Sequence, residues 1–126
     1  MNERDVKKEN VFLTKSFTFA VLMVRTSQKL VEKKEFVLSR QLLRSGTAVG
    51  ALIREAQNAE SKADFIHKLS IAQKECDETI YWLELLKETD YINENEFSKL
   101  KLSATELLKM LRSSILTTKQ KQAQKS

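Results

Sequence analysis

The chain has 126 residues, of which 41% are hydrophobic and 31% charged, with two glycines and no proline. That length suits one domain with its own core, and the mixture is typical of amphipathic helices rather than of disorder. Strand-and-turn folds need regularly spaced clusters of Gly, Pro, Asn and Asp, which are missing here. The sequence therefore predicts an all-α protein.

Neither export nor membrane insertion is predicted. The first ten residues are charged and lack the apolar core of a signal peptide. The most apolar run, from Phe17 to Val24, is far shorter than the roughly 20 residues of a membrane span. The single Cys76 cannot form an internal disulfide, which fits a reducing compartment. We therefore expect a cytoplasmic protein with no membrane partner.

Four helices are expected in chain order, at about residues 11–32, 39–59, 62–89 and 94–118. Ser39 is the expected N-cap of the second helix, Ser61 of the third, and Asn93 or Asn95 of the fourth. Since short segments connect long helices, the sequence predicts an antiparallel up-down-up-down four-helix bundle.

The bundle is expected over residues 11–118, after a flexible N-terminal segment at residues 1–10 and before a disordered basic tail at residues 119–126. Placing residues at about 100° per position gives one apolar stripe on each of the last three helices. These core residues are Leu42, Val49, Ile53 and Ala56, then Phe65, Leu69, Ala72, Cys76, Ile80, Leu83 and Leu86, and finally Phe97, Leu100, Ala104, Leu107, Leu108, Leu111 and Ile115.

Two helices carry more apolar surface than a monomer needs. The first is apolar around most of its circumference, Phe17 and Val21 included, and the third has a second stripe of Ile71, Trp82 and Leu85. A large aromatic outside the core usually marks an interface, although Trp82 could also cover the end of the bundle. We expect these five residues to form a homo-oligomer interface.

Gly46 and Gly50 lie in the middle of the second helix. Glycine there costs about 1 kcal/mol relative to alanine, so a close approach of a neighbouring helix is the expected reason for both. A phosphate-binding loop fits poorly, because no Lys-Ser/Thr pair follows and no strand precedes.

No catalytic or metal-binding constellation is present. His67 is the only histidine, and Cys76 falls in the core stripe, where a thiol is unreactive. The third helix carries Asp77, Glu84 and Glu88 on one polar face, which fits a solvated acidic face or a contact with a basic face of a neighbouring subunit. We expect no cofactor and no enzymatic activity.

Basic stripes are the one feature that suggests a ligand. The net charge is +4 over residues 1–61, −5 over residues 62–96 and +6 over residues 97–126. Such stripes neutralise phosphates without reading sequence, although on a monomer they can simply keep a helix soluble. The stripes are formed by Arg40, Arg44 and Arg54 on the second helix and by Lys101, Lys109, Arg112 and Lys119 on the fourth.

The stretch from Arg44 to Leu86 resembles the four-helix bundle proteins encoded in intervening sequences of bacterial large-subunit ribosomal RNA genes, a family that also includes the accessory variability determinant of diversity-generating retroelements. The matching motifs are Arg44-Ser45, the small residues up to Gly50, Glu55-Ala56, Ser61-Lys62-Ala63-Asp64-Phe65, Lys74-Glu75, Glu78-Thr79 and Tyr81-Trp82-Leu83. Members commonly have Asn after the Gly-Ala pair, where this chain has Leu52.

The resemblance implies a homopentameric ring without enzymatic activity, binding to RNA or DNA and, for the retroelement branch, a reverse-transcriptase partner. Two functional hypotheses follow from the residues and the resemblance together. One is an oligomer that binds nucleic-acid backbone through the basic stripes. The other is a protein-interaction scaffold whose basic faces bind an acidic partner.

Overall fold

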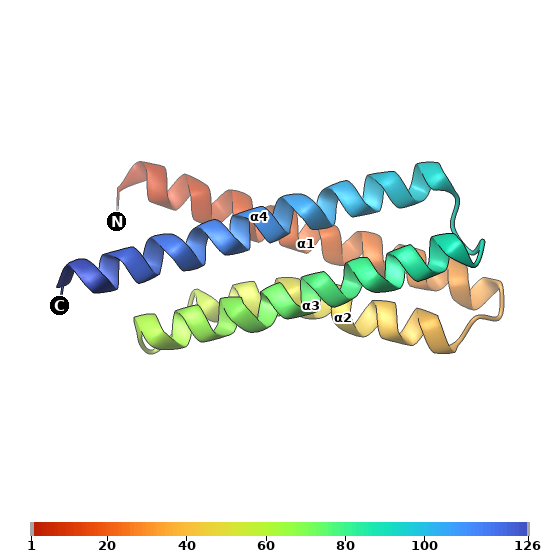
Figure 1. Cartoon of the computed structure of the whole chain (residues 1–126), viewed down its shortest axis with the longest axis horizontal. Helices are drawn as coiled ribbons and strands as arrows, with labels where there is room; N and C mark the ends of the chain where they lie inside the picture. The colour runs from red at the N-terminus through yellow and green to blue at the C-terminus, as the bar shows by residue number, and fades with distance from the viewer. Residues whose placement is uncertain (1, 126) are drawn as a thin grey trace.

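The computed structural model describes residues 2–125, and the side chains of residues 2–124. It contains four helices, α1 (Glu3–Glu32), α2 (Val37–Ala56), α3 (Lys62–Glu88) and α4 (Glu94–Lys125). Successive helices run in opposite directions, so that both ends of the chain lie at the same end of the molecule (Figure 1). The predicted all-α, up-down-up-down bundle is confirmed.

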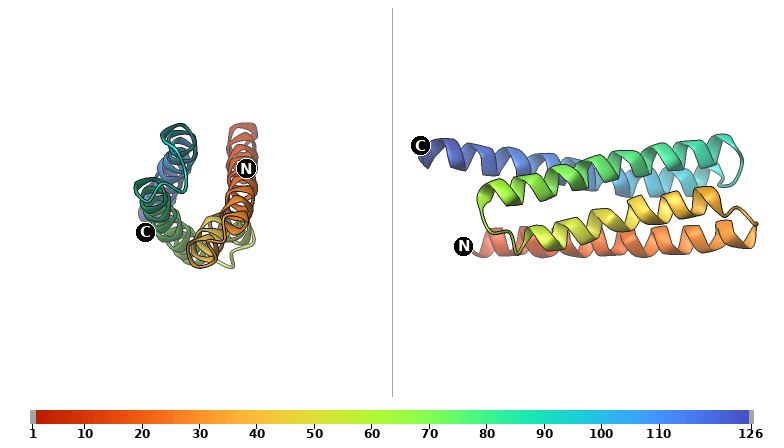
Figure 2. Two further views of the ribbon diagram at one scale, coloured as in Figure 1. Left: turned by 90° about the vertical axis from the view of Figure 1, so that its right-hand side faces the viewer. Right: turned by 90° about the horizontal axis from the view of Figure 1, so that it is seen from below.

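The bundle is closed on three sides and open on the fourth. α1 packs along α2, α2 along α3 and α3 along α4, whereas α1 and α4 make far fewer contacts. Seen from the end, the helices trace a U whose two arms are α1 and α4 (Figure 2). These two helices cross, and an ion pair of 3.1 Å joins Lys15 Nζ to Glu106 Oε2 between them.

Two helices are longer than predicted. α1 begins at Glu3 rather than near residue 11, since Asn2 Oδ1 accepts a hydrogen bond of 2.9 Å from the backbone N–H of Asp5. Carboxylates at Glu3 and Asp5 also suit the first turn of a helix.

α4 continues to Lys125 rather than ending near residue 118. Its last turns consist of Lys, Gln and Ala, which all favour helix, and nothing in them stops one. Helix therefore occupies most of the two segments expected to be flexible, 1–10 and 119–126. Residues 1 and 126 of those segments lie outside the described residues.

Two of the three predicted N-caps are confirmed. Ser61 Oγ accepts from the Asp64 N–H at 3.0 Å, and Asn93 Oδ1 accepts from the Glu96 N–H at 2.8 Å. Ser39 is not the cap of α2, which begins two residues earlier. There Glu35 Oε1 accepts from the backbone N–H groups of residues 37 and 38, at 2.7 and 2.6 Å.

The core follows the predicted stripes closely. Every predicted core residue of α2 and α4 is buried, and in α3 only Phe65 and Ile80 are half-buried instead. α1 contributes Phe12, Phe19, Met23 and Leu30. Each such side chain stabilises the fold by roughly 1.5–3 kcal/mol when it leaves water. Within residues 2–125 no helix is long and apolar enough to cross a membrane.

The two glycines of α2 face α1, which confirms the predicted close approach of a neighbouring helix. A Cβ on Gly46 would lie 2.3 Å from Met23 Cγ, and a Cβ on Gly50 would lie 3.1 Å from the backbone carbonyl oxygen of Ser16. Met23 is fully buried, and close packing in a protein core restricts the movement of such a side chain. The absence of both side chains is therefore what allows α1 and α2 to approach so closely.

We predict that Gly46→Ala lowers the free energy of unfolding by about 1–2 kcal/mol, because overpacking against Met23 outweighs the gain in helix propensity. In a Met23→Ala background the penalty should shrink by about 1 kcal/mol or more, since the closest atom is gone. Urea unfolding followed by circular dichroism measures both. A Gly46→Ala chain more stable than the wild type would contradict the close approach.

Candidate functional site

The predicted basic stripe of α4 lies on the surface. Lys101, Lys109, Arg112 and Lys119 are all exposed, and none of them forms an ion pair with a described residue. On a helical projection three of them lie within about 20° of one another, and Lys109 lies about 80° away. The stripe thus presents unpaired positive charge along one helix, with Lys109 turned towards α1.

The three arginines of α2 do not form one surface. The guanidinium of Arg54 lies 5.9 Å from the ring centre of Phe17 on α1. Arg44 instead faces α3 and pairs with Glu75 and Glu78. Arg40 is exposed on the α1 side, where it lines the same surface hollow as Val31. Arg40 and Arg54 therefore share the α1–α2 face, and Arg44 is separate from them.

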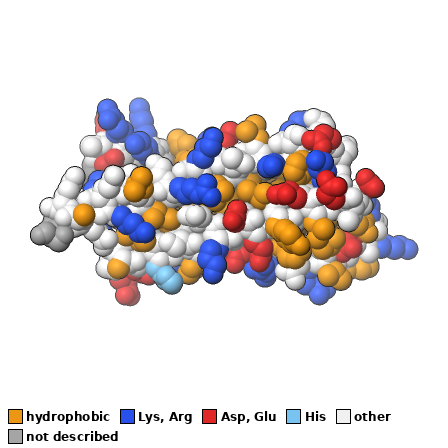
Figure 3. Space-filling model, viewed as in Figure 1, with side chains coloured by type: hydrophobic (Ala, Val, Ile, Leu, Met, Phe, Trp, Pro, Cys, Tyr) orange, Lys and Arg blue, Asp and Glu red, His pale blue; other side chains and the backbone are white. Residues whose placement is uncertain are grey.

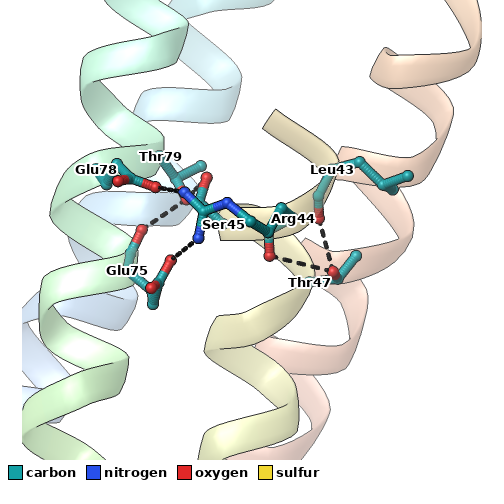
Figure 4. A network of polar contacts seen from close by, with 7 residues as sticks. All are labelled: Leu43, Arg44, Ser45, Thr47, Glu75, Glu78 and Thr79. Carbon is teal, nitrogen blue, oxygen red and sulfur yellow. Dashed lines mark hydrogen bonds and ion pairs between the residues drawn. The ribbon is translucent and has the colours of Figure 1, made fainter. Parts of the chain in front are cut away.

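Arg44 belongs to a polar cluster between α2 and α3 (Figure 4), which we call the α2–α3 polar cluster: Arg44, Ser45, Glu75, Glu78 and Thr79. Arg44 Nη1 donates to Glu75 Oε2 at 3.1 Å and Arg44 Nη2 to Glu78. Thr79 Oγ1 lies 2.8 Å from Ser45 Oγ and 2.7 Å from the Glu75 carbonyl oxygen. Ser45 and Thr79 are fully buried, so their mutual hydrogen bond satisfies both hydroxyls away from water.

The hydrogen bond to Glu78 is the main reason why the pKa of Arg44 is raised above its ordinary value. Because two carboxylates already balance its charge, this guanidinium attracts a phosphate less strongly than an unpaired arginine does. Its position favours a structural role over the predicted role in nucleic-acid binding.

The single cysteine and the single histidine of the chain lie in different surroundings. Burial raises the pKa of the Cys76 thiol to about 12, with a smaller contribution from the nearby charge of Asp77. Its Sγ lies 3.3 Å from the carbonyl oxygen of Ala104, inside the core. His67 is exposed. The described residues contain no group of three or more His, Cys, Asp or Glu side chains that could hold a metal ion.

The predicted interface residues divide between two faces. Phe17 on α1 is 58% exposed, and Val21 beside it is half-buried. Ile71, Trp82 and Leu85 on α3 are also half-buried. Hydrophobic side chains gather over α2 and α3 in the half of the molecule nearest the α1–α2 and α3–α4 turns (Figure 3). The two sets therefore belong to different patches of the surface.

Trp82 is less exposed than its helical position suggests. It packs against the core, and its ring meets that of Tyr81 edge-on with 5.1 Å between the centres. Its indole Nε1 is buried without a hydrogen-bond partner among the described residues. The aromatic of α3 that does face solvent is Tyr81, which is 58% exposed. Tyr81 is not among the interface residues predicted from the sequence, although the adjacent Trp82 is.

Two valines extend the apolar strip of α1 that begins at Phe17. Val24 and Val31 are 37% and 47% exposed. They follow Phe17 at intervals of seven residues, which keeps all three on one side of the helix. Leu43 of α2 lines the same surface hollow as Val24 and Val31 and is 38% exposed. The exposed apolar strip of α1 therefore extends beyond Phe17 and Val21, the two α1 residues predicted to form the interface.

Residues 8–113 match the family model described as 23S rRNA-intervening sequence protein. The chain belongs to this family. A similar solved structure is that of a protein of unknown function from the S23 ribosomal protein family of Bacteroides thetaiotaomicron. It is 53% identical, with a TM-score of 0.84, and the match covers 86% of this chain and 97% of that one. A comparison with curated proteins found no match.

Membership of the family was predicted from the motifs, and the structure shows what several of those motifs do. Arg44-Ser45, Glu75 and Glu78-Thr79 supply the whole α2–α3 polar cluster. Gly46 and Gly50 allow α1 to pack closely against α2. Leu52, which stands where members commonly have Asn, is half-buried and packs against the core. These family motifs therefore stabilise the packing of α2 against α1 and α3.

We predict that Arg44→Ala lowers the free energy of unfolding by about 1 kcal/mol, because it leaves two carboxylates without their partner. Arg40→Ala is the matched control, since Arg40 is an exposed arginine of the same helix without an ion pair, and it should change stability by less than about 0.5 kcal/mol. Equal effects of the two substitutions in urea unfolding would refute the structural role of Arg44.

Proposed function

We propose that this member of the 23S rRNA-intervening sequence protein family is a non-enzymatic homo-oligomer, a pentameric ring, that binds nucleic-acid backbone. The observation that carries the proposal is the pairing of two surfaces on one small chain: an exposed apolar strip on α1 and an unpaired basic stripe on α4. The first suits self-association and the second suits phosphates.

The apolar surface supports a ring rather than a two-fold dimer. The strip begins at Phe17 on α1, and the other patch contains Ile71, Trp82 and Leu85 on α3. When one patch binds a different patch on the next copy, the contact is heterologous, and a suitable rotation closes it into a ring. Exposed apolar side chains at Phe17, Val24 and Val31 would then leave water.

The basic stripe supports nucleic acid as the ligand. Lysine and arginine side chains that lack carboxylate partners attract phosphates at little cost, because no ion pair has to be broken first. A ring would repeat the α4 stripe in every subunit and so strengthen the local field. Exposed aromatic rings are absent from the stripe itself, which consists of Lys101, Lys109, Arg112 and Lys119, so the contact would be with backbone and not with bases.

The proposal of a non-enzymatic role rests on the chemistry of two side chains. At neutral pH the Cys76 thiol is protonated, because its pKa is raised to about 12 by burial, and a protonated thiol is a poor nucleophile. His67 is exposed and has no hydroxyl, thiol or carboxylate bound to it among the described residues. Neither arrangement resembles the paired nucleophile and base of covalent catalysis.

For nucleic acid, we predict that Lys109→Glu with Arg112→Glu weakens binding of a labelled RNA hairpin and of a DNA duplex at least about tenfold at low salt, and flattens the salt dependence. Fluorescence anisotropy measures both. Arg25→Glu with Lys29→Glu is the matched control, because it reverses one arginine and one lysine on the exposed side of α1. If the Lys109/Arg112 variant binds as well as the wild type, the nucleic-acid-binding site does not lie on α4.

For self-association, we predict that Phe17→Glu with Val24→Glu yields smaller particles than the wild type by multi-angle light scattering. Both side chains are exposed in the single chain, so the fold should survive the change, which circular dichroism verifies. Gln120→Glu, an exposed position on α4, is the control and should leave the mass unchanged. An unchanged mass for the α1 double variant would exclude the strip as an interface.

A further inference from the structure

A groove lies between the N-terminal turns of α1 and the C-terminal half of α4, on the open side of the bundle. It encloses about 840 Å³ and receives side chains from both helices as well as from α3. Beyond the crossing at Lys15 and Glu106 the two helices diverge (Figure 1). No other helix of the described chain fills the space between them.

The floor of this α1–α4 groove is apolar. Phe12 from α1, Phe65 from α3 and Met110 from α4 line it. Phe12 is buried, whereas Phe65 and Met110 are only half-buried although both pack against the core. Val11, 47% exposed, adds apolar surface at the edge. An uncovered floor contributed by three helices is a continuation of the core that this chain leaves in contact with water.

The rim of the groove is mainly basic. Arg4, Lys7 and Lys8 stand on the α1 side and Lys109 on the α4 side, against two carboxylates. In Figure 3 blue side chains mark the N-terminal end of α1 and the length of α4. None of these four cations forms an ion pair with a described residue. The groove thus combines an apolar floor with an unneutralised positive rim.

We propose that the α1–α4 groove is a docking site for an amphipathic helix of a partner protein, with apolar side chains on one face and acidic side chains beside them. Such a helix would pack between α1 and α4, cover Phe65 and Met110, and place its carboxylates beside the basic rim. This goes beyond the proposed binding of nucleic acid, because the groove and the α4 stripe share only Lys109.

A peptide fits the groove better than nucleic acid does. Phosphates would neutralise the rim but leave the apolar floor uncovered. Bases could cover it only by stacking on exposed aromatic faces, but Phe12 is 5% exposed and Phe65 is half-buried. Met110 offers a flexible apolar side chain, the kind found where helical peptides bind. The chemistry of floor and rim together therefore selects an acidic amphipathic segment.

The test uses a labelled helical peptide of about 18 residues, with leucines forming one face and glutamates flanking it. We expect the full-length protein to bind it in a fluorescence anisotropy titration. Lys7→Glu with Lys8→Glu should weaken binding at least about tenfold. The matched control, Lys29→Glu with Lys99→Glu, makes the same charge change at exposed positions of α1 and α4 that lie outside the groove. It should change peptide binding less than about twofold.

A second variant tests the floor independently of charge. Met110→Gln keeps the length of the side chain but makes it polar, and should weaken the same peptide about fivefold or more. A peptide with its leucines and glutamates scrambled should bind more weakly than the amphipathic one.

Three results would overturn the proposal. The first is equal binding of the peptide by the Lys7/Lys8 variant and its control. The second is displacement of the peptide by an RNA hairpin that itself depends on Lys7 and Lys8, which would make the groove a nucleic-acid site. The third is loss of self-association in the Lys7/Lys8 variant alone, which would make a second copy of the chain the occupant. Failure of the α4 stripe to bind nucleic acid leaves the prediction for the peptide unchanged.

Discussion

The middle of α2 contacts two neighbouring helices through small side chains, and the rest of the bundle depends on these contacts. On one side Gly46 and Gly50 let α1 approach until Met23 and the Ser16 backbone occupy the space of a side chain. On the other side Ser45 hydrogen-bonds Thr79 of α3 in the core. A larger residue at any of these positions would move a neighbouring helix and, with it, the surface that the helix presents.

The same packing explains why the bundle is open. α2 holds α1 and α3 on either side, and α4 packs on α3, so the fourth contact, between α4 and α1, is a crossing and not a full interface. The helices diverge from that crossing and leave the groove with Phe65 and Met110 half-exposed on its floor. In this protein the surface, and not an enclosed pocket, is where we place the function.

Much of the fold could be predicted from the sequence. The stripes on α2 and α4 are buried as expected, because spacing at 3.6 residues per turn fixes which side chains share a face. The glycines predicted a close approach, although only the structure identifies α1 as the partner. Helix ends were less predictable: Glu35, and not Ser39, caps α2, since a carboxylate two residues before a helix can reach its first N–H groups.

The candidate site was harder to predict because charge pairing depends on tertiary contacts. Arg40, Arg44 and Arg54 share a helical face, yet α3 supplies two carboxylates to Arg44 and α1 supplies the Phe17 ring to Arg54. No pattern along α2 contains that information. The α1–α4 groove was invisible for the same reason, since its floor needs side chains from three helices.

The central claim is that this chain works as an assembly through its surfaces. The most direct measurement is the mass of the wild-type protein in solution, by light scattering after size-exclusion chromatography at micromolar concentration. Five copies of the 14.6 kDa chain give a mass of about 73 kDa, which a pentameric ring predicts. A single species of 14.6 kDa would contradict self-association and leave the exposed strip of α1 without its proposed role.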